Sequence, residues 1–180
     1  MNINLLQSEK LLKSIFRRGF IYASEIVIFA LDMTIKSFLQ EISRIIPKDR
    51  IYTDEMRRLA WGTDAGFYRL IPKIVIRSAN EDEITAILKT ADKYGVPITF
   101  RAAGTSLSGQ AISDSVLVIA GKEWENYKIA EDKKSITLQP GLVGQRVNDI
   151  LKPFGKKFPP DPASIKSAMV GGIIDRKSVV

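Results

Sequence analysis

The segment from Arg101 to Gln110, RAAGTSLSGQ, contains the residue types that bind a diphosphate. Its two glycines let the backbone approach a ligand closely, and successive peptide N–H groups can converge on an anion. The hydroxyl groups of Thr105, Ser106 and Ser108 add hydrogen-bond donors. The segment matches neither the Walker A motif nor the GxGxxG fingerprint. A plain surface loop between two strands fits the same composition equally well, so both interpretations stay open on the residues alone.

A proline-rich segment, residues 158–164 (FPPDPAS), precedes a glycine pair at Gly171 and Gly172. Three prolines within four positions fix the shape of this loop. The side chains of Asp161 and Ser164 are suited either to capping a helix or to binding the hydroxyl and phosphate groups of a ligand. The segment is therefore a second candidate binding loop.

The 180 residues include no Cys and no His. These side chains supply disulfides, thiolate nucleophiles, most zinc ligands and the usual general base near neutral pH. Their absence excludes a catalytic triad, a cysteine zinc site, an iron–sulfur cluster and a histidyl-linked cofactor within this chain. We expect no metal site and no catalytic residue here, and any chemistry needs an outside reagent such as an organic cofactor.

Composition and charge indicate one folded domain without a basic arm. Hydrophobic residues make up 45% of the chain, and the net charge is +7. The excess is spread over the chain, +3 in residues 1–60 and +4 in residues 61–180. The aromatic residues are scattered, with no stacking platform, so a nucleic-acid-binding module is the least favoured class.

The elements that must position the two loops follow a regular order. The β-branched run at residues 74–76, a helix from the N-cap Asn80 to the stop at Gly95, and a strand at residues 98–100 predict a right-handed parallel βαβ unit. The glycine-containing loop follows that second strand directly. Next we expect a buried strand at 115–120, a hairpin formed by 128–130 and 136–138, and a helix with Val143, Val147, Ile150 and Leu151 on one face.

The N-terminal part is less regular. Apolar residues at helical spacing predict a short helix over 35–46, and a second short helical stretch is expected over 51–60. Residues 1–32 place a basic stretch before an apolar run that Glu25 interrupts, which is too short for a transmembrane helix. We interpret them as an amphipathic extension or a stretch upstream of the natural start. A secretion signal and peripheral membrane contact are the alternatives.

Taken together, RAAGTSLSGQ, the QPG at residues 139–141, the PPDPASI segment and the glycine pair resemble the FAD-linked oxidases of the vanillyl-alcohol oxidase and p-cresol methylhydroxylase type. The resemblance covers residues 35–174 and is greatest to the D-lactate and glycolate dehydrogenase branch. It implies an α+β, PCMH-type FAD-binding domain, with the βαβ unit followed by a small mixed sheet, incomplete at the C-terminus.

The resemblance also implies which residues bind FAD, non-covalently. In that family the glycine-containing loop wraps the pyrophosphate with backbone amides, and the PPDPAS and GG segments line the adenosine and flavin side. The residues carried over on this basis are Arg101, Ala102, Ala103, Gly104, Thr105, Ser106, Leu107, Asp161, Ser164, Gly171 and Gly172.

The likeness ends at Asp175, and the family's cap domain, which binds substrate and commonly supplies a His base, has no counterpart here. We therefore expect an N-terminal extension (1–32), a partial FAD-binding domain (33–174) and a non-family tail (175–180) of a truncated chain. In the family a hydride moves from the α-carbon of a 2-hydroxy acid to flavin N5. The expected function is the FAD-binding portion of such an oxidoreductase, cytoplasmic and without a transmembrane segment. The larger members of this branch append an iron–sulfur domain, so the resemblance allows an iron–sulfur domain or subunit as a partner in the complete protein. The alternative is a non-catalytic fragment that no longer binds flavin.

This division predicts that a chain starting at Met33 is as stable as the full chain, because residues 1–32 lie outside the family likeness. The melting temperatures of the two proteins should agree. A decrease of more than about 5 °C, which for a domain of this size means well over 1 kcal/mol, would show that the extension packs on the core.

Overall fold

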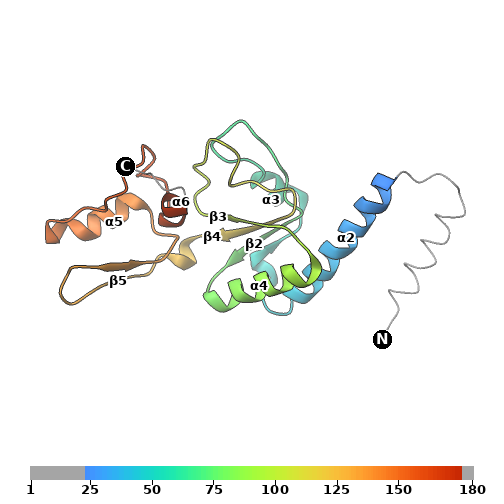
Figure 1. Ribbon diagram of the computed structural model, residues 1–180, viewed down its shortest axis with the longest axis horizontal. Coiled ribbons are helices and arrows are strands. Elements are labelled where there is room, and N and C mark those ends of the chain that lie inside the picture. The colour runs from blue at the N-terminus through green and yellow to red at the C-terminus, as the bar shows by residue number, and fades with distance from the viewer. Residues whose placement is uncertain (1–22, 176–180) are drawn as a thin grey trace, which may run out of the picture.

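A four-stranded sheet with the order β1-β2-β4-β3 occupies the centre of the molecule (Figure 1). The structure is a computed structural model that describes residues 23–175, so the expectations for residues 1–22 and 176–180 lie outside the described part. The strands are β1 (Ile51–Tyr52), β2 (Ile74–Ser78), β3 (Ile98–Arg101) and β4 (Val116–Ala120). Strands β2 and β3 both run parallel to β4, whereas β1 is antiparallel to β2.

The predicted strand–helix–strand unit is present as β2, α4 (Glu81–Tyr94) and β3. The side chain of Asn80 accepts the N–H of Glu83 at 2.9 Å, and Gly95 ends the helix in the left-handed region with φ of 63°. Strand β4 lies between β2 and β3, so the two strands of the unit are parallel but not neighbours. The glycine-containing loop is the connection that leads from the edge strand β3 back to β4.

Apolar residues cover both faces of the sheet, as expected for buried parallel strands. On one face α2 (Ala23–Ile42) and α4 pack on alternate strand residues, with Phe38, Ile87 and Val118 fully buried among them. On the opposite face Leu117 and its neighbours contact Tyr52 and Trp61, which flank α3 (Glu55–Ala60). Figure 1 shows α3 on the far side of the sheet from α2 and α4.

A smaller unit holds the proline-rich loop and the glycine pair. It consists of the hairpin β5 (Tyr127–Ile129) and β6 (Ile136–Leu138), then α5 (Gly144–Leu151) and α6 (Val170–Asp175), around a separate apolar core. Short 3-10 helices lie at Lys48–Arg50 (η1), Lys122–Trp124 (η2) and Lys152–Phe154 (η3). The indole N–H of Trp124 donates to the carbonyl of Ser78 at 2.8 Å, which fastens η2 to the end of β2.

Two expectations for the N-terminal part are only partly confirmed. Residues 51–60 are not one helical stretch, because Ile51 and Tyr52 pair with Ile76 and Val75 as an edge strand, and α3 begins only at Glu55. The first helix also differs from the predicted range, since α2 extends from Ala23 to Ile42 and crosses the expected boundary at residue 33 without interruption. Within residues 23–175, no helix is both long and apolar enough to cross a lipid bilayer.

An ion pair joins η1 to the start of α4. Arg50 donates from both terminal nitrogens to the Glu83 carboxylate at 2.8 and 2.6 Å, and the side chains are only 17% and 10% exposed. Glu83 also accepts the N–H of Ala79 at 2.8 Å. Burial raises the pKa of the Glu83 carboxyl, but these hydrogen bonds and the charge of Arg50 outweigh burial, so its pKa lies below the ordinary 4.5.

Replacing Glu83 with Gln should lower the free energy of unfolding by about 2 kcal/mol at pH 7, because Arg50 loses a charged acceptor. A lowered carboxyl pKa stabilises the fold above the unfolded-state pKa, and that contribution disappears as pH falls through the folded-state value. The difference between wild type and variant, measured by urea unfolding, should therefore shrink below about pH 4. The exposed Glu125→Gln change is the control and should stay within about 0.5 kcal/mol. An equal Glu83→Gln effect at both pH values would contradict the assignment.

Candidate functional site

The glycine-containing loop leaves the carboxyl end of β3, the edge at which open α/β sheets bind ligands. Gly104 and Gly109 have φ values of 71° and 76°, a region that L-residues with side chains rarely adopt. The peptide N–H groups of residues 103–107 donate to no other group in the part of the chain that the structure describes. A run of successive free donors on a curved loop is the arrangement that binds an anion.

The side chain of Arg101 holds the base of this loop. Its Nη1 donates to the carbonyl oxygens of Thr63 at 2.7 Å and Ala111 at 3.1 Å, and its guanidinium lies 5.2 Å from the centre of the Trp61 ring. Burial lowers the pKa of Arg101, and the nearby charge of Asp64 opposes that shift only in part. An arginine stays protonated even so, because its ordinary pKa is far above neutrality.

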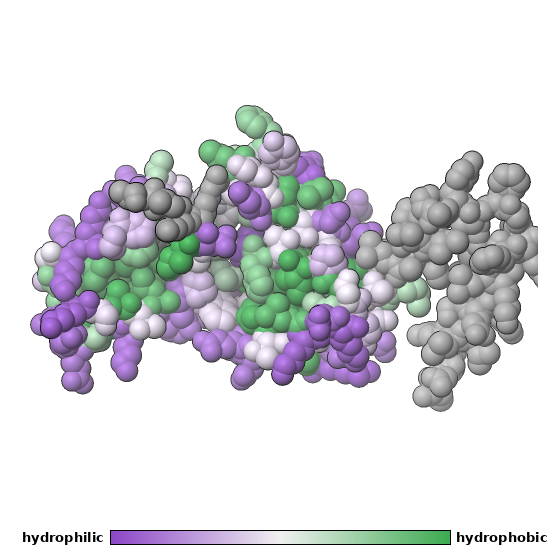
Figure 2. Space-filling view, viewed as in Figure 1, coloured by the Kyte–Doolittle hydropathy of each residue, from purple (hydrophilic) through white to green (hydrophobic). Residues whose placement is uncertain are grey.

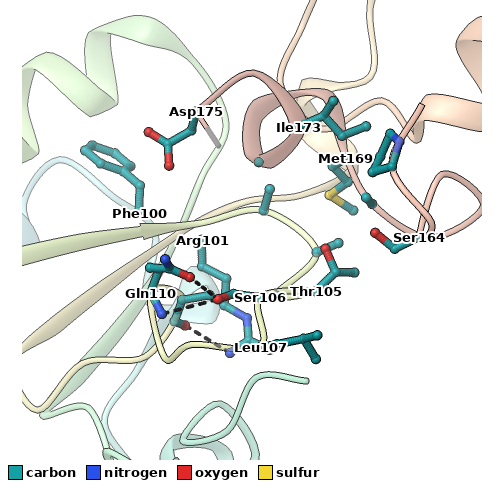
Figure 3. Close-up of a pocket in the computed structure, with 17 residues that line it drawn as sticks. Phe100, Arg101, Thr105, Ser106, Leu107, Gln110, Ser164, Met169, Ile173 and Asp175 are labelled. Carbon is teal, nitrogen blue, oxygen red and sulfur yellow. Dashed lines mark hydrogen bonds between the residues drawn. The ribbon is translucent and has the colours of Figure 1, made fainter. Parts of the chain in front are cut away.

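A cavity of about 520 Å³ lies between the loop and the segment from Pro162 to Asp175. Figure 3 shows Thr105 on one side of it, with Ser164 and Met169 on the other. The lining residues are Phe100, Arg101, Ala102, Ala103, Gly104, Thr105, Ser106, Leu107, Gln110, Ala111, Pro162, Ser164, Ala168, Met169, Gly172, Ile173 and Asp175.

A second cavity of about 710 Å³ adjoins the first, and the two share Phe100, Arg101, Ala102, Gln110, Gly172 and Asp175. It extends over β3 toward the start of α4, where Glu81 and Thr85 line it. Both volumes lie in the range of sites for organic ligands. Arg101 is the only cationic side chain that lines either cavity in the described part of the chain, so an anionic ligand here would be bound mainly by peptide N–H groups and hydroxyls.

The structure brings together ten of the eleven residues predicted to bind the cofactor. Residues 101–107, Ser164 and Gly172 line the first cavity, and Gly171 lines the second. Asp161 lines neither, and its carboxylate pairs with Lys157 at 2.7 Å on the exposed side of the proline-rich loop. These placements leave the roles of the residues in binding as predictions.

Several cavity residues were not predicted. Gln110 belongs to the quoted segment, and its side chain bonds to the hydroxyl of Ser106, which also accepts the N–H of Ser108 at 3.2 Å. Met169 and Ile173 come from the far wall and resemble ordinary core residues in the sequence, so no pattern marked them. Asp175 lies just where the family likeness was expected to end, and it lines both cavities.

The two glycines of the pair have different surroundings. A Cβ atom at Gly171 would lie 2.8 Å from the Cβ of Pro140, so this glycine is required by packing of α6 against the end of the hairpin. At Gly172 a Cβ atom would meet nothing within 4 Å, and the residue lines both cavities. The missing side chain at Gly172 therefore keeps ligand space open.

Comparison with solved structures identifies the fold as that of PCMH-type flavoenzymes. The structure of p-cresol methylhydroxylase with substrate bound matches with a TM-score of 0.64 and 14% identity, over 79% of this chain and 30% of that one. An alkyldihydroxyacetonephosphate synthase matches with a TM-score of 0.65 and 17% identity, over 75% and 28%. Only the architecture is shared at this level of identity.

The family model described as an FAD binding domain matches residues 72–179, more than half of the chain. The chain therefore belongs to this family of FAD-binding domains. The match includes most of the 175–180 segment that the sequence analysis set apart as a tail, and the proposed division into domains stays a prediction.

Curated relatives specify the branch. The glycolate oxidase subunit GlcD of Bacillus subtilis is 30% identical over 81% of this chain and 32% of its own length. The D-lactate dehydrogenase of Archaeoglobus fulgidus is 28% identical, over 77% and 31%. The D-2-hydroxyglutarate dehydrogenase of Escherichia coli is 29% identical, over 77% and 14%. The chain thus spans about a third or less of the length of these relatives.

Replacing Arg101 with Lys should lower the free energy of unfolding by about 2 kcal/mol, because a single ammonium group cannot reproduce a planar donor that bonds several carbonyls. Urea unfolding measures the change. Arg146→Lys on the exposed face of α5 is the matched control and should have almost no effect. Equal stabilities of Arg101→Lys and the control would contradict the supporting role of Arg101.

Proposed function

We propose that this chain is the FAD-binding portion of a flavin-dependent oxidoreductase that acts on 2-hydroxy acids of the D-lactate or glycolate type. The observation that carries the proposal is the row of peptide N–H groups without an acceptor among the described residues at 103–107, which are residues that line a cavity of about 520 Å³. The diphosphate of FAD matches these donors in charge and in size. The two adjoining cavities then hold the organic groups on either side of the diphosphate, without a covalent link.

The residues that line the cavities match the pyrophosphate of FAD and its ring systems separately. The peptide N–H groups of the loop and the hydroxyl of Thr105 would bind the pyrophosphate. Arg101 would stabilise the loop conformation through its hydrogen bonds to Thr63 and Ala111. Phe100 and Met169 offer apolar surface to a ring system, and Ser164 offers a hydroxyl. When bound, FAD supplies the acceptor for a hydride from the α-carbon of the substrate.

The substrate class rests on the relatives. A glycolate oxidase subunit, a D-lactate dehydrogenase and a D-2-hydroxyglutarate dehydrogenase all have names that denote a 2-hydroxy acid. Among residues 23–175, Arg101 is the one cationic side chain that lines the two cavities, and it donates to backbone carbonyls, so we assign no carboxylate-binding group to them. We therefore assign cofactor binding to this chain and substrate oxidation to the complete protein.

Replacing Gly172 with Leu should lower FAD affinity without lowering the stability of the fold. A leucine at this helical position should maintain or raise the melting temperature, because glycine is a poor helix former, yet its side chain would extend into both cavities. FAD affinity, measured by fluorescence titration, should fall by a factor on the order of ten or more. Ile174→Gln, on the same helix and lining neither cavity, is the control and should bind FAD as the wild type does.

Unchanged FAD affinity in Gly172→Leu would contradict the assignment of the cavities. The related change Gly104→Val is a weaker test than the sequence alone suggests. A Cβ atom at Gly104 would collide with the guanidinium of Arg101, at a φ of 71°, so this substitution disturbs the fold as well as the ligand site.

The isolated chain should not oxidise D-lactate, glycolate or a longer 2-hydroxy acid, even when loaded with FAD. Removing the hydroxyl proton needs a base within hydrogen-bond reach, and the sequence contains no His. The check is anaerobic stopped-flow mixing of the loaded protein with a panel of 2-hydroxy acids. Bleaching of the oxidised flavin band at an enzymatic rate would show that residues present here complete an active site.

A further inference from the structure

A small pocket of about 210 Å³ lies between the turn of the β5–β6 hairpin and η3. It shares no lining residue with the two flavin cavities. Its floor is apolar and includes Ile136, Leu151 and Phe158, which belong to the core of the smaller unit. Figure 2 shows this end of the molecule as an apolar area with hydrophilic residues around it.

Four lysines surround this floor, namely Lys133, Lys134, Lys156 and Lys157. We call this site the lysine pocket. Lys156 Nζ donates to the carbonyl of Lys133 at 2.6 Å, and Lys157 forms an ion pair with Asp161.

The ammonium of Lys134 has no hydrogen-bond or ion-pair partner among the described residues. Asp132, the acidic residue of the turn, is occupied through Oδ1 by the backbone N–H of Lys134 at 3.0 Å. The described residues that line the pocket include four lysines and no carboxylate, so positive charge exceeds negative charge at its walls.

The backbone at Lys133 supports a specific use of its side chain. Lys133 has a φ of 58°, the single positive value at a residue other than glycine in the part of the chain that the structure describes. Glycine or asparagine usually occupies such a turn position, because a side chain there is strained. The lysine instead places its ammonium 5.4 Å from the centre of the Phe154 ring, at the edge of the pocket.

We propose that the lysine pocket binds a small organic phosphate. Ammonium groups act as point charges on a phosphate, and four of them line this pocket. A phosphate monoester, which carries close to two negative charges, is attracted more strongly by this cluster than a singly charged carboxylate is. The apolar floor accommodates a compact organic group next to the phosphate. The volume is below the 300–1,000 Å³ typical of drug-sized ligand sites, so a nucleotide does not fit within it.

Phenyl phosphate is a suitable probe, because it joins a dianionic phosphate to one apolar ring. Titration calorimetry with the full chain at about pH 8 should show saturable binding with a Kd of about 1 mM or tighter. Inorganic phosphate should bind more weakly, since it leaves the floor uncovered, and added NaCl should weaken both.

Two variants test the residues. Lys134→Ala and Lys133→Gly should each weaken phenyl phosphate binding about fivefold. Lys133→Gly should also maintain or raise the melting temperature, because glycine accepts the positive φ without strain, so weaker binding in this variant is not a folding defect. Lys89→Ala, an exposed lysine on α4, is the control and should bind as the wild type does.

The glycine-containing loop is the other place where a phosphate could bind, and Gly172→Leu distinguishes the two. Binding retained in Gly172→Leu and reduced in the lysine variants supports the lysine pocket, whether or not the chain binds FAD. The proposal is overturned by any of three results. These are no saturable binding up to about 10 mM, equal affinity in wild type and lysine variants, or loss of binding in Gly172→Leu alone.

Discussion

The hydrogen bonds that Arg101 donates to distant carbonyl oxygens are the interaction on which the proposed cofactor site depends. Arg101 is the last residue of β3 and pairs with Ile119 of β4, so the anchor is part of the sheet itself. Its guanidinium reaches the carbonyl of Thr63, 38 residues earlier, and that of Ala111 on the far side of the loop. A loop fixed by a side chain does not need its own peptide N–H groups for internal hydrogen bonds. The N–H groups of residues 103–107 therefore have no acceptor among the described residues and are available to the cofactor that we propose.

Contacts between the central sheet and the smaller unit determine the position of residues 162–175, which line the cavity opposite the glycine-containing loop. Trp124 fastens η2 to β2, and the chain continues from there into the hairpin. The N–H of Gly171 donates to the carbonyl of Pro140 at 2.9 Å, which ties α6 to the end of that hairpin. Packing therefore places α6 opposite the glycine-containing loop across the cavity. Gly172 of this helix lines both cavities, and its lack of a side chain leaves their volume open. Ligand binding at this junction would couple the two units, since each contributes one side of the cavity.

Much of this arrangement could be predicted from the sequence, because local patterns determine it. The β-branched runs, the Asn80 cap and the Gly95 stop predicted β2, α4 and β3 correctly, and the glycine-containing loop follows β3 as expected. The role of the Arg101 side chain was not predicted, since its acceptors are backbone carbonyls that carry no sequence signal. Ile51 and Tyr52 were misassigned because a two-residue edge strand has no periodicity of its own. Tertiary packing places Met169 and Ile173 in the wall of the cavity, which no local pattern indicates. Asp161 forms an ion pair with Lys157 and does not line either cavity, and this too could not be predicted from the sequence.

The central claim is that this chain by itself binds FAD, and reconstitution followed by gel filtration tests it most directly. The purified full chain is incubated with excess FAD, passed through a desalting column and examined by absorption spectroscopy. The account predicts that the protein fraction retains a flavin band in roughly equimolar amount, and that denaturation releases the flavin, as a non-covalent complex requires. A protein fraction without flavin absorption, from a chain shown by circular dichroism to be folded, would contradict the account.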